Sequence, residues 1–157
     1  MTRRRSPPDV RFERDITVSI EIDAPVERVW SQLEPVETHV EWMADAVAIH
    51  FLGEQTRGVG TRFVCDTKVG PFRLSDEMEI TVWSPGDEMG VRHRGLVTGS
   101  GSFRLVAIDL DRRTRMVWSE TLSFPWWMGG PIGASIGKVV LRAIWRRNLA
   151  EFRRLVT

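Results

Sequence analysis

The sequence has little of several residue types on which particular functions depend. It contains a single cysteine, Cys65, in 157 residues, which excludes an internal disulfide and favours a reducing compartment. Its three histidines, His39, His50 and His93, show no metal-binding spacing, and no second thiol lies near Cys65 in the sequence. We therefore expect no metal site and no cofactor, and we interpret Cys65 as a core residue rather than as a nucleophile.

An excess of charge and long apolar runs are also missing. The formal net charge of +1 creates no field that would favour nucleic acid or an acidic membrane. No apolar run approaches the ~18 residues that a membrane span needs, and residues 2–8 lack the apolar core of a signal peptide. We therefore expect a cytoplasmic protein with no nucleic-acid partner and no stable membrane insertion. The sequence leaves its oligomeric state open.

The composition that is present is that of one globular domain. With 42% hydrophobic and 27% charged residues, the chain is long enough to bury a core. Residues 1–14 are basic, contain proline and show no periodicity, so we expect them to form a disordered tail. Residues 15–157 are expected to form a single ligand-binding domain.

Hydrophobic periodicity predicts a strand, two short helices and then only strands. Residues 16–22 alternate as a half-buried strand, and Asp23-Ala24-Pro25 ends it and begins a short helix. A second short helix is predicted over 36–43. Six segments of period two follow, and they cover residues 47–51, 61–69, 72–82, 89–95, 99–110 and 114–124. The short turns between them indicate an antiparallel meander.

The last predicted element is a long helix over residues 132–156, and its apolar residues lie on two nearly opposite sides. We expect Leu141, Trp145, Leu149 and Phe152 to anchor it to the sheet or to the short helices. The other set, which we expect to face a cavity or its lid, is Ile132, Ile136, Val140 and Ala143. Because one helix cannot fill the concavity of a large curved sheet, a cavity is expected between the two.

These segments also carry a resemblance to a known family. The run from Ile20 to Trp30, with Glu41-Trp42-Met43 a dozen residues later, resembles the opening of the START-like (SRPBCC) superfamily, specifically its polyketide cyclase/dehydrase and lipid-transport branch. The late strand over 114–120 and the closing helix are similar as well, so the resemblance covers about residues 16–156.

The resemblance implies an α+β helix-grip fold. In this fold a curved seven-stranded antiparallel sheet wraps around a long C-terminal helix, two short helices lie between strands 1 and 2, and a hydrophobic tunnel separates sheet and helix. Family members include aromatase/cyclases and lipid and hormone carriers, so the resemblance implies a fold more sharply than a function.

Three titratable residues are predicted to point into the same interior. Asp76 shares a strand face with Leu74 and Met78, where a carboxylate is costly unless it is paired or protonated. If Trp83 lies opposite Glu88 across the turn, His93 falls opposite Met78 on that same face.

Glu120 lies among the apolar residues of the last strand. We therefore take Asp76, His93 and Glu120 as candidate catalytic acid and base groups.

Each candidate also has a structural explanation. Asp76 can bond a loop amide at the rim of the sheet, and a bulge would move His93 onto the solvated face of its arginine neighbours. Glu120 can pair with Arg104, which lies opposite it in one register of the last hairpin, and a one-residue slip would change that partner.

Further residues are predicted to contact a ligand because the alternation or the long helix places them around the tunnel. Trp126, Trp127 and Met128 form either a plug packed on the sheet or a gate that a flat apolar ligand contacts. The full set of candidate ligand-binding residues is Phe72, Leu74, Met78, Val91, Arg104, Trp118, Leu122, Trp126, Trp127, Ile136 and Val140.

Two classes of function fit these features. The first is a module that binds a hydrophobic small molecule, such as a lipid, polyketide or terpenoid, in an internal cavity. The second is an enzyme of the polyketide cyclase or dehydratase type, in which Asp76, His93 or Glu120 transfers protons. A scaffolding role would instead predict a filled core without a cavity.

Overall fold

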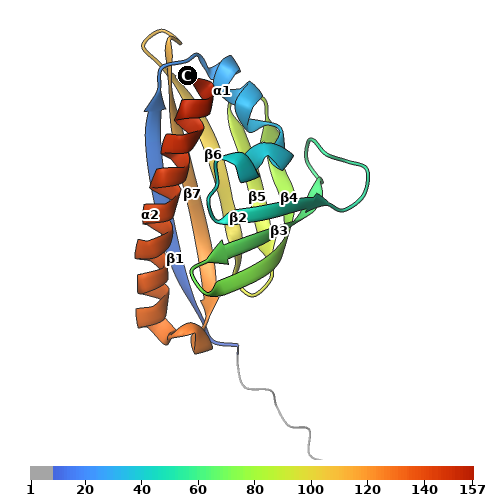
Figure 1. Ribbon diagram of the computed structural model, residues 1–157, viewed down its shortest axis with the longest axis vertical. Coiled ribbons are helices and arrows are strands. Elements are labelled where there is room, and N and C mark those ends of the chain that lie inside the picture. The colour runs from blue at the N-terminus through green and yellow to red at the C-terminus, as the bar shows by residue number, and fades with distance from the viewer. Residues whose placement is uncertain (1–8) are drawn as a thin grey trace, which may run out of the picture.

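A computed structural model describes residues 9–157 of the chain, which form one strongly curved antiparallel sheet and a long helix (Figure 1). The strands are β1 (Arg11–Ile22), β2 (Ala46–Phe51), β3 (Arg62–Val69), β4 (Phe72–Ser84), β5 (Glu88–Arg94), β6 (Thr98–Ile108) and β7 (Arg113–Pro125). The helical elements are α1 (Val26–Leu33), the 3-10 helix η1 (Val36–Glu41), the 3-10 turn η2 (Trp126–Met128) and α2 (Gly130–Val156). The predicted helix-grip architecture is confirmed.

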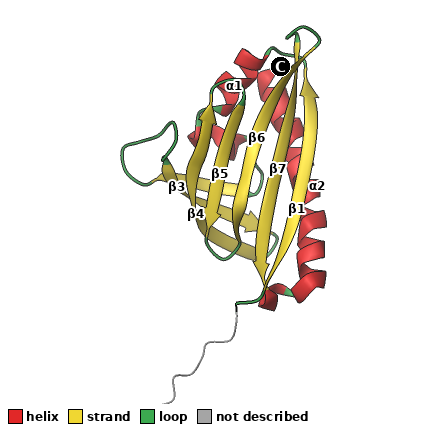
Figure 2. Ribbon diagram, turned by 180° about the vertical axis from the view of Figure 1, so that it is seen from behind, coloured by secondary structure: helices red, strands yellow, loops and turns green. Residues whose placement is uncertain are grey.

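The sheet has the strand order β1-β7-β6-β5-β4-β3-β2, so β1 and β2 form its two edges. The bend of the sheet turns β2 and β3 across the other strands, and α2 runs along β1 on the inner side (Figures 1 and 2). Successive side chains of a strand point to opposite faces, and burial alternates accordingly along β7. One face of the sheet is therefore lined by buried residues and the other is exposed.

The short helices close one end of this curved layer. Pro25 precedes the first helical residue of α1, where its missing N–H costs no hydrogen bond. The helix then buries Val29, Trp30 and Leu33. α1 and η1 both lie between β1 and β2, as predicted.

The N-terminal boundary of the domain differs from the expectation. β1 begins at Arg11, and residues 11–14 pair with residues 122–125 of β7, so they are strand and not tail. Charged side chains at Arg11, Glu13 and Arg14 hide the alternation in the sequence, whereas Phe12 and the ladder to β7 maintain the strand. Residues 1–8, the remainder of the predicted tail, lie outside the described residues.

α2 spans 27 residues, about 40 Å at 1.5 Å per residue. Its second half is anchored as predicted, because Trp145, Leu149 and Phe152 are buried in the core, although Leu141 is only half-buried. The expectation for the other apolar side is wrong. The residues of that side, which are exposed on the outward face of the helix, are Ile132, Ile136, Val140 and Ala143.

The predicted strand register is correct for part of one hairpin and wrong in another. His93 lies opposite Met78 as expected, although a bulge between Ile80 and Val82 places Met89, not Glu88, opposite Trp83. In the last hairpin the loop spans residues 109–112 instead of 111–113. Glu120 therefore lies opposite Gly101 rather than opposite Arg104.

No helix in the described part of the chain is long and apolar enough to cross a membrane.

Two glycines in the first half of α2 give opposite predictions for stability. A Cβ atom added to Gly137 would lie 3.5 Å from the Phe124 ring, an ordinary contact, whereas one added to Gly133 would lie 2.1 Å from the Met128 carbonyl oxygen. Because alanine is favoured over glycine within helices, Gly137→Ala should raise the free energy of unfolding by about 0.5–1 kcal/mol.

Gly133→Ala is the matched control and should lower the free energy of unfolding, since the backbone of η2 would have to shift. Urea denaturation of both variants measures the two effects. Equal effects of the two substitutions would contradict the packing of α2 on η2.

Candidate functional site

The inner face of the sheet brings together the three predicted titratable residues. Asp76 on β4, His93 on β5 and Glu120 on β7 all lie on this face and are largely buried. Apolar residues of the same strands surround them, so the predicted placement is confirmed. The inner-face residues from the predicted ligand-binding set are Leu74, Met78, Val91, Trp118 and Leu122.

His93 and Glu120 form the central contact of this site. The His93 Nε2 atom lies 3.1 Å from Glu120 Oε2, with 11% and 7% of the two side chains exposed. The Trp118 indole N–H donates a 2.8 Å hydrogen bond to the other oxygen, Glu120 Oε1. The imidazole is within ion-pair distance but is not aligned for a hydrogen bond, so His93 Nε2 has no hydrogen-bond partner in the described residues.

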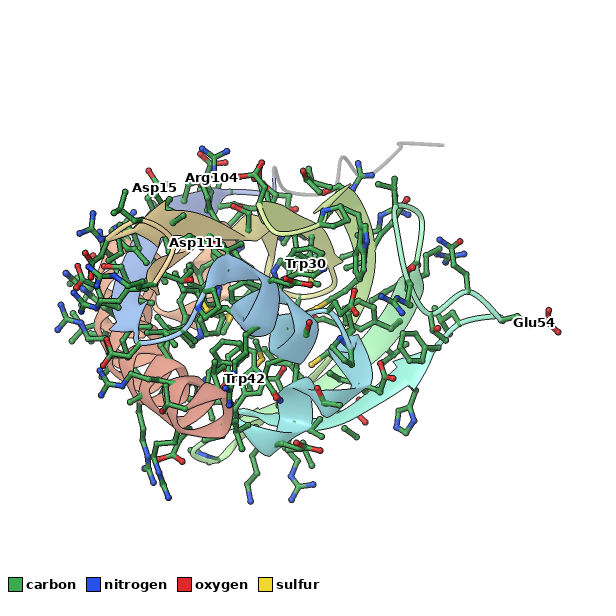
Figure 3. All side chains as sticks on the ribbon, turned by 90° about the horizontal axis from the view of Figure 1, so that it is seen from above. Asp15, Trp30, Trp42, Glu54, Arg104 and Asp111 are labelled. Atoms are coloured by element: carbon green, nitrogen blue, oxygen red, sulfur yellow. The ribbon has the colours of Figure 1, made fainter. Side chains whose placement is uncertain are left out.

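The predicted alternative, a pair between Arg104 and Glu120, is wrong. Arg104 lies on the outer face of the sheet and bonds Glu88 at 3.0 Å. Figure 3 shows Arg104 outside the sheet, on the opposite side from the interior where Trp42 lies. Arg104 therefore does not contact the inner face as a ligand-binding residue would.

Two glycines make room for the buried carboxylates. A Cβ atom on Gly101 would lie 2.2 Å from Glu120 Cγ, and one on Gly95 would lie 1.9 Å from Asp76 Oδ1. Glu120 thus lies against bare backbone of the neighbouring strand β6, and Asp76 against bare backbone of the loop that follows β5, the close approach that glycine allows. In the Gly99-Ser100-Gly101 segment, Gly101 serves this packing, whereas a Cβ atom on Gly99 would lie 1.9 Å from the Thr121 carbonyl oxygen.

Asp76 has an unsatisfied oxygen in the interior. Its side chain is buried, and Oδ1 has no hydrogen-bond partner among the described residues. Burial raises the pKa of Asp76, while the charge of His93 and the backbone amide of Leu96 act in the opposite direction. The Asp76 side chain therefore points inward and also lies near the loop amide of Leu96, two possibilities that were predicted as alternatives.

The environment of His93 favours its protonated form. Burial by itself lowers the pKa of the imidazole, but the Glu120 carboxylate, with a smaller contribution from Asp76, outweighs burial and raises the pKa above its ordinary value. A buried histidine next to carboxylates is thus able to exchange a proton near neutral pH. This is the chemistry expected of an acid–base pair.

Three interior polar residues were not predicted. The Asn148 amide group donates a 2.7 Å hydrogen bond to Asp45 Oδ1 and accepts one of 3.0 Å from the Ala44 backbone N–H. Burial raises the pKa of Asp45, to which the charge of Glu120 adds. A single asparagine on the apolar face of α2 is a signal that could have indicated a buried polar contact, but not its partner.

Trp42 is the third unpredicted residue. Its ring lies in the centre of the interior (Figure 3), with centroids 5.0 Å from Phe152 and 6.1 Å from Trp118. The indole nitrogen is buried without a hydrogen-bond partner in the described chain. Trp118 itself stacks on Trp145 of α2 at 4.5 Å, so aromatic rings line the interior beside Glu120.

The remaining reactive groups do not add chemistry to the site. Burial raises the pKa of Cys65 to about 11, which keeps the thiol protonated as expected of a core cysteine. Burial lowers the pKa of His39 to about 4, and its Nε2 bonds the Leu33 carbonyl at 2.7 Å. No group of three or more His, Cys, Asp or Glu in the described residues has the arrangement of a metal site.

Several predicted ligand-binding residues lie away from the interior. Trp126 and Trp127 are 55% and 56% exposed, so neither indole plugs the core. Ile136 and Val140 point outward from α2, and Phe72 is 65% exposed at the β3–β4 hairpin. The interior is therefore formed by the sheet and by the second half of α2.

Comparison with solved structures identifies the same fold in proteins of low sequence identity. A Thermus thermophilus protein has a TM-score of 0.79 at 14% identity, covering 91% of this chain and 97% of its own. The Zhui aromatase/cyclase of Streptomyces sp. R1128 has a TM-score of 0.68 at 18% identity, covering 92% of each chain.

Norcoclaurine synthase from Thalictrum flavum, solved with dopamine and hydroxybenzaldehyde, has a TM-score of 0.70 at 15% identity and covers 99% of this chain and 94% of its own. These identities show a shared fold alone.

No curated protein matches the chain by sequence. Residues 13–157, nearly the whole chain, match the family described as polyketide cyclase/dehydrase and lipid transport. This match agrees with the curved seven-stranded sheet and its long C-terminal helix. The chain therefore belongs to the polyketide cyclase/dehydrase and lipid transport family.

Proposed function

We propose that this domain binds a hydrophobic small molecule against the inner face of the sheet, with its polar group directed at Asp76 and His93. The observation that carries the proposal is a pair of buried polar atoms without hydrogen-bond partners in the described residues, Asp76 Oδ1 and Trp42 Nε1. A buried polar atom without a partner costs about 1–3 kcal/mol, and a ligand that bonds it recovers that cost.

The surroundings of these atoms support an apolar ligand body. Inner-face residues Leu74, Met78 and Val91 are only partly buried, although they point toward the interior. The aromatic rings of Trp42, Trp118 and Phe103 are already buried against one another, so the apolar area left for a ligand to cover lies on Leu74, Met78 and Val91. A ligand that covers these side chains gains roughly 25 cal/mol for each Å² of apolar area removed from water.

An enzymatic role is the second candidate, favoured by the raised pKa values of His93 and Asp76. A protonated imidazole and a neutral carboxylic acid can each donate a proton to a ligand carbonyl, and their conjugate bases can remove one. In this proposal Glu120 orients His93 and stabilises its charge. The aromatase/cyclase and the synthase of the same fold make such a role chemically reasonable, but fold alone does not assign it.

Native mass spectrometry of the protein purified from its own host tests ligand binding. We expect a small-molecule adduct that survives gentle ionisation and disappears on denaturation. A Val91→Phe variant, which adds bulk to the inner face, should retain less of the adduct, whereas Val106→Phe on the outer face should retain all of it. A bare protein mass, or equal retention by both variants, would contradict an interior ligand.

Substitutions at the site separate a carrier from an enzyme. With the recovered ligand, Asp76→Asn and His93→Gln should weaken binding in a carrier, by roughly tenfold for the loss of one buried hydrogen bond. In an enzyme, turnover should fall by about 10²–10⁴-fold, the usual contribution of a general acid or base, while binding is largely retained. His50→Gln, on the exposed side of β2, is the control and should change neither quantity.

The His93 contact with Glu120 makes a separate prediction about pH. The folded-state pKa of His93 should lie above its ordinary value of about 6.5 and should fall in Glu120→Gln, because the negative charge that raises it is removed. NMR titration of the imidazole signals measures both values. His39, whose pKa is lowered to about 4, serves as the internal control and should not respond.

The raised pKa of His93 also determines how the free energy of unfolding depends on pH. A pKa raised in the folded state means that protonation of His93 stabilises the protein below the unfolded-state pKa, and that this contribution is lost as pH rises through the folded-state pKa. Glu120→Gln should therefore cost more stability near pH ~6 than above the folded-state pKa. A His93 pKa at or below about 6.5, unchanged in the variant, would disprove the ion pair.

A further inference from the structure

The first half of α2 and the preceding η2 expose an apolar surface that the fold does not use. We call it the α2 patch. Its members, which are between 40% and 73% exposed, are Trp126, Trp127, Ile132, Ile136, Val139 and Val140. Most exposed apolar residues of a soluble protein are scattered singly, so six large ones on two adjoining elements indicate an interaction surface.

The patch lies on the outward side of the helix. At 100° per residue, Ile132 and Ile136 fall nearly opposite Trp145 and Phe152, which are buried in the core, and Val139 lies about 120–140° from them. A groove of about 520 Å³ follows this side, and its lining includes Arg14 and Pro131 as well as the aliphatic residues. In Figure 1 this part of the molecule is its lower left end, remote from α1.

Unpaired positive charge surrounds the patch. α2 has no acidic residue before Glu151. Its basic residues Lys138, Arg142, Arg146 and Arg147 have no carboxylate within 4.0 Å in residues 9–157.

Arg14 lines the groove. Within residues 9–157 its guanidinium donates hydrogen bonds only to the Ser135 hydroxyl and to backbone carbonyl groups.

The arginines of the sheet other than Arg14 and Arg73 behave differently. Arg62, Arg92 and Arg94 on the outer face are paired with Glu77 or Glu79. The net charge of +1 thus conceals a segregation, in which the sheet is neutralised and α2 is cationic.

We propose that the α2 patch docks onto an anionic lipid surface, with the indoles and aliphatic side chains in the headgroup boundary and the helix cations on the lipid phosphates. An apolar surface flanked by lysine and arginine is the pattern of interfacial helices. A second copy of the chain fits less well, because a symmetric contact between two such faces would bring the unpaired cations of both copies together. Docking leaves the helix on the membrane surface and does not require a span.

Vesicle co-sedimentation tests the proposal. The full-length protein should bind vesicles of equal parts phosphatidylcholine and phosphatidylglycerol, and should not bind phosphatidylcholine alone. Raising the salt to roughly 1 M, where the screening length is about 3 Å, should weaken binding. A blue shift of tryptophan emission should accompany binding and should be lost in Trp126→Ser/Trp127→Ser.

Matched double variants separate the two parts of the patch. Ile136→Ser/Val139→Ser should lower vesicle affinity by roughly tenfold or more, whereas Val82→Ser/Val106→Ser on the outer face of the sheet should not. Arg142→Gln/Arg146→Gln should lower it similarly, with Arg28→Gln/Arg73→Gln as the control of equal charge change. All of these side chains are exposed, so urea unfolding should confirm that each variant folds.

Two results would overturn the proposal. One is equal affinity for neutral and anionic vesicles, or none for either. The other is a dimer in analytical ultracentrifugation that Ile136→Ser/Val139→Ser dissociates, without vesicle binding by the original protein. That second result would assign the α2 patch to contact between copies of this chain.

Discussion

The pairing of the first strand with the last is the contact on which the rest of this structure depends. β1 and β7 pair without interruption, from Arg11 opposite Pro125 to Ile22 opposite Thr114. Because η2 and α2 follow β7 directly, this ladder determines where the helix begins, and α2 then packs back along β1. The same ladder holds Trp118 and Glu120 under the helix, where Trp145 stacks on Trp118. The fold and the Glu120 side of the site therefore share one set of hydrogen bonds.

Most of the fold was predictable from the sequence because strand periodicity is a local property. Alternating side chains defined seven strands, and Pro25 defined the start of α1. Register was less predictable, since it depends on turn geometry. Asp109, Leu110 and Asp111 adopt positive φ angles of 54–59°, and no glycine indicated that a four-residue loop would form there. The misplaced loop is what moved Arg104 opposite Glu120 in the prediction.

The candidate site was predictable to the extent that it depends on alternation. Asp76, His93 and Glu120 stand in phase with apolar neighbours, so their inward orientation could be inferred before the structure. The contacts of Asp45 and Asn148 could not, because they join segments more than a hundred residues apart. The contact of Glu120 with His93 also required the true register, together with the missing side chain of Gly101.

α2 shows why an apolar surface does not reveal its own partner. Both sides of its first half are apolar, and the sequence cannot specify which one the sheet covers; the structure buries only Ala134 there. The second half is held by Trp145, Asn148 and Phe152, so the two halves differ in how firmly they are attached. A helix opens first where it has the fewest buried contacts with the rest of the protein. The first half, which also contains Gly133 and Gly137, is thus the part of α2 that can separate from the sheet at least cost, and it is the part that faces outward with apolar side chains.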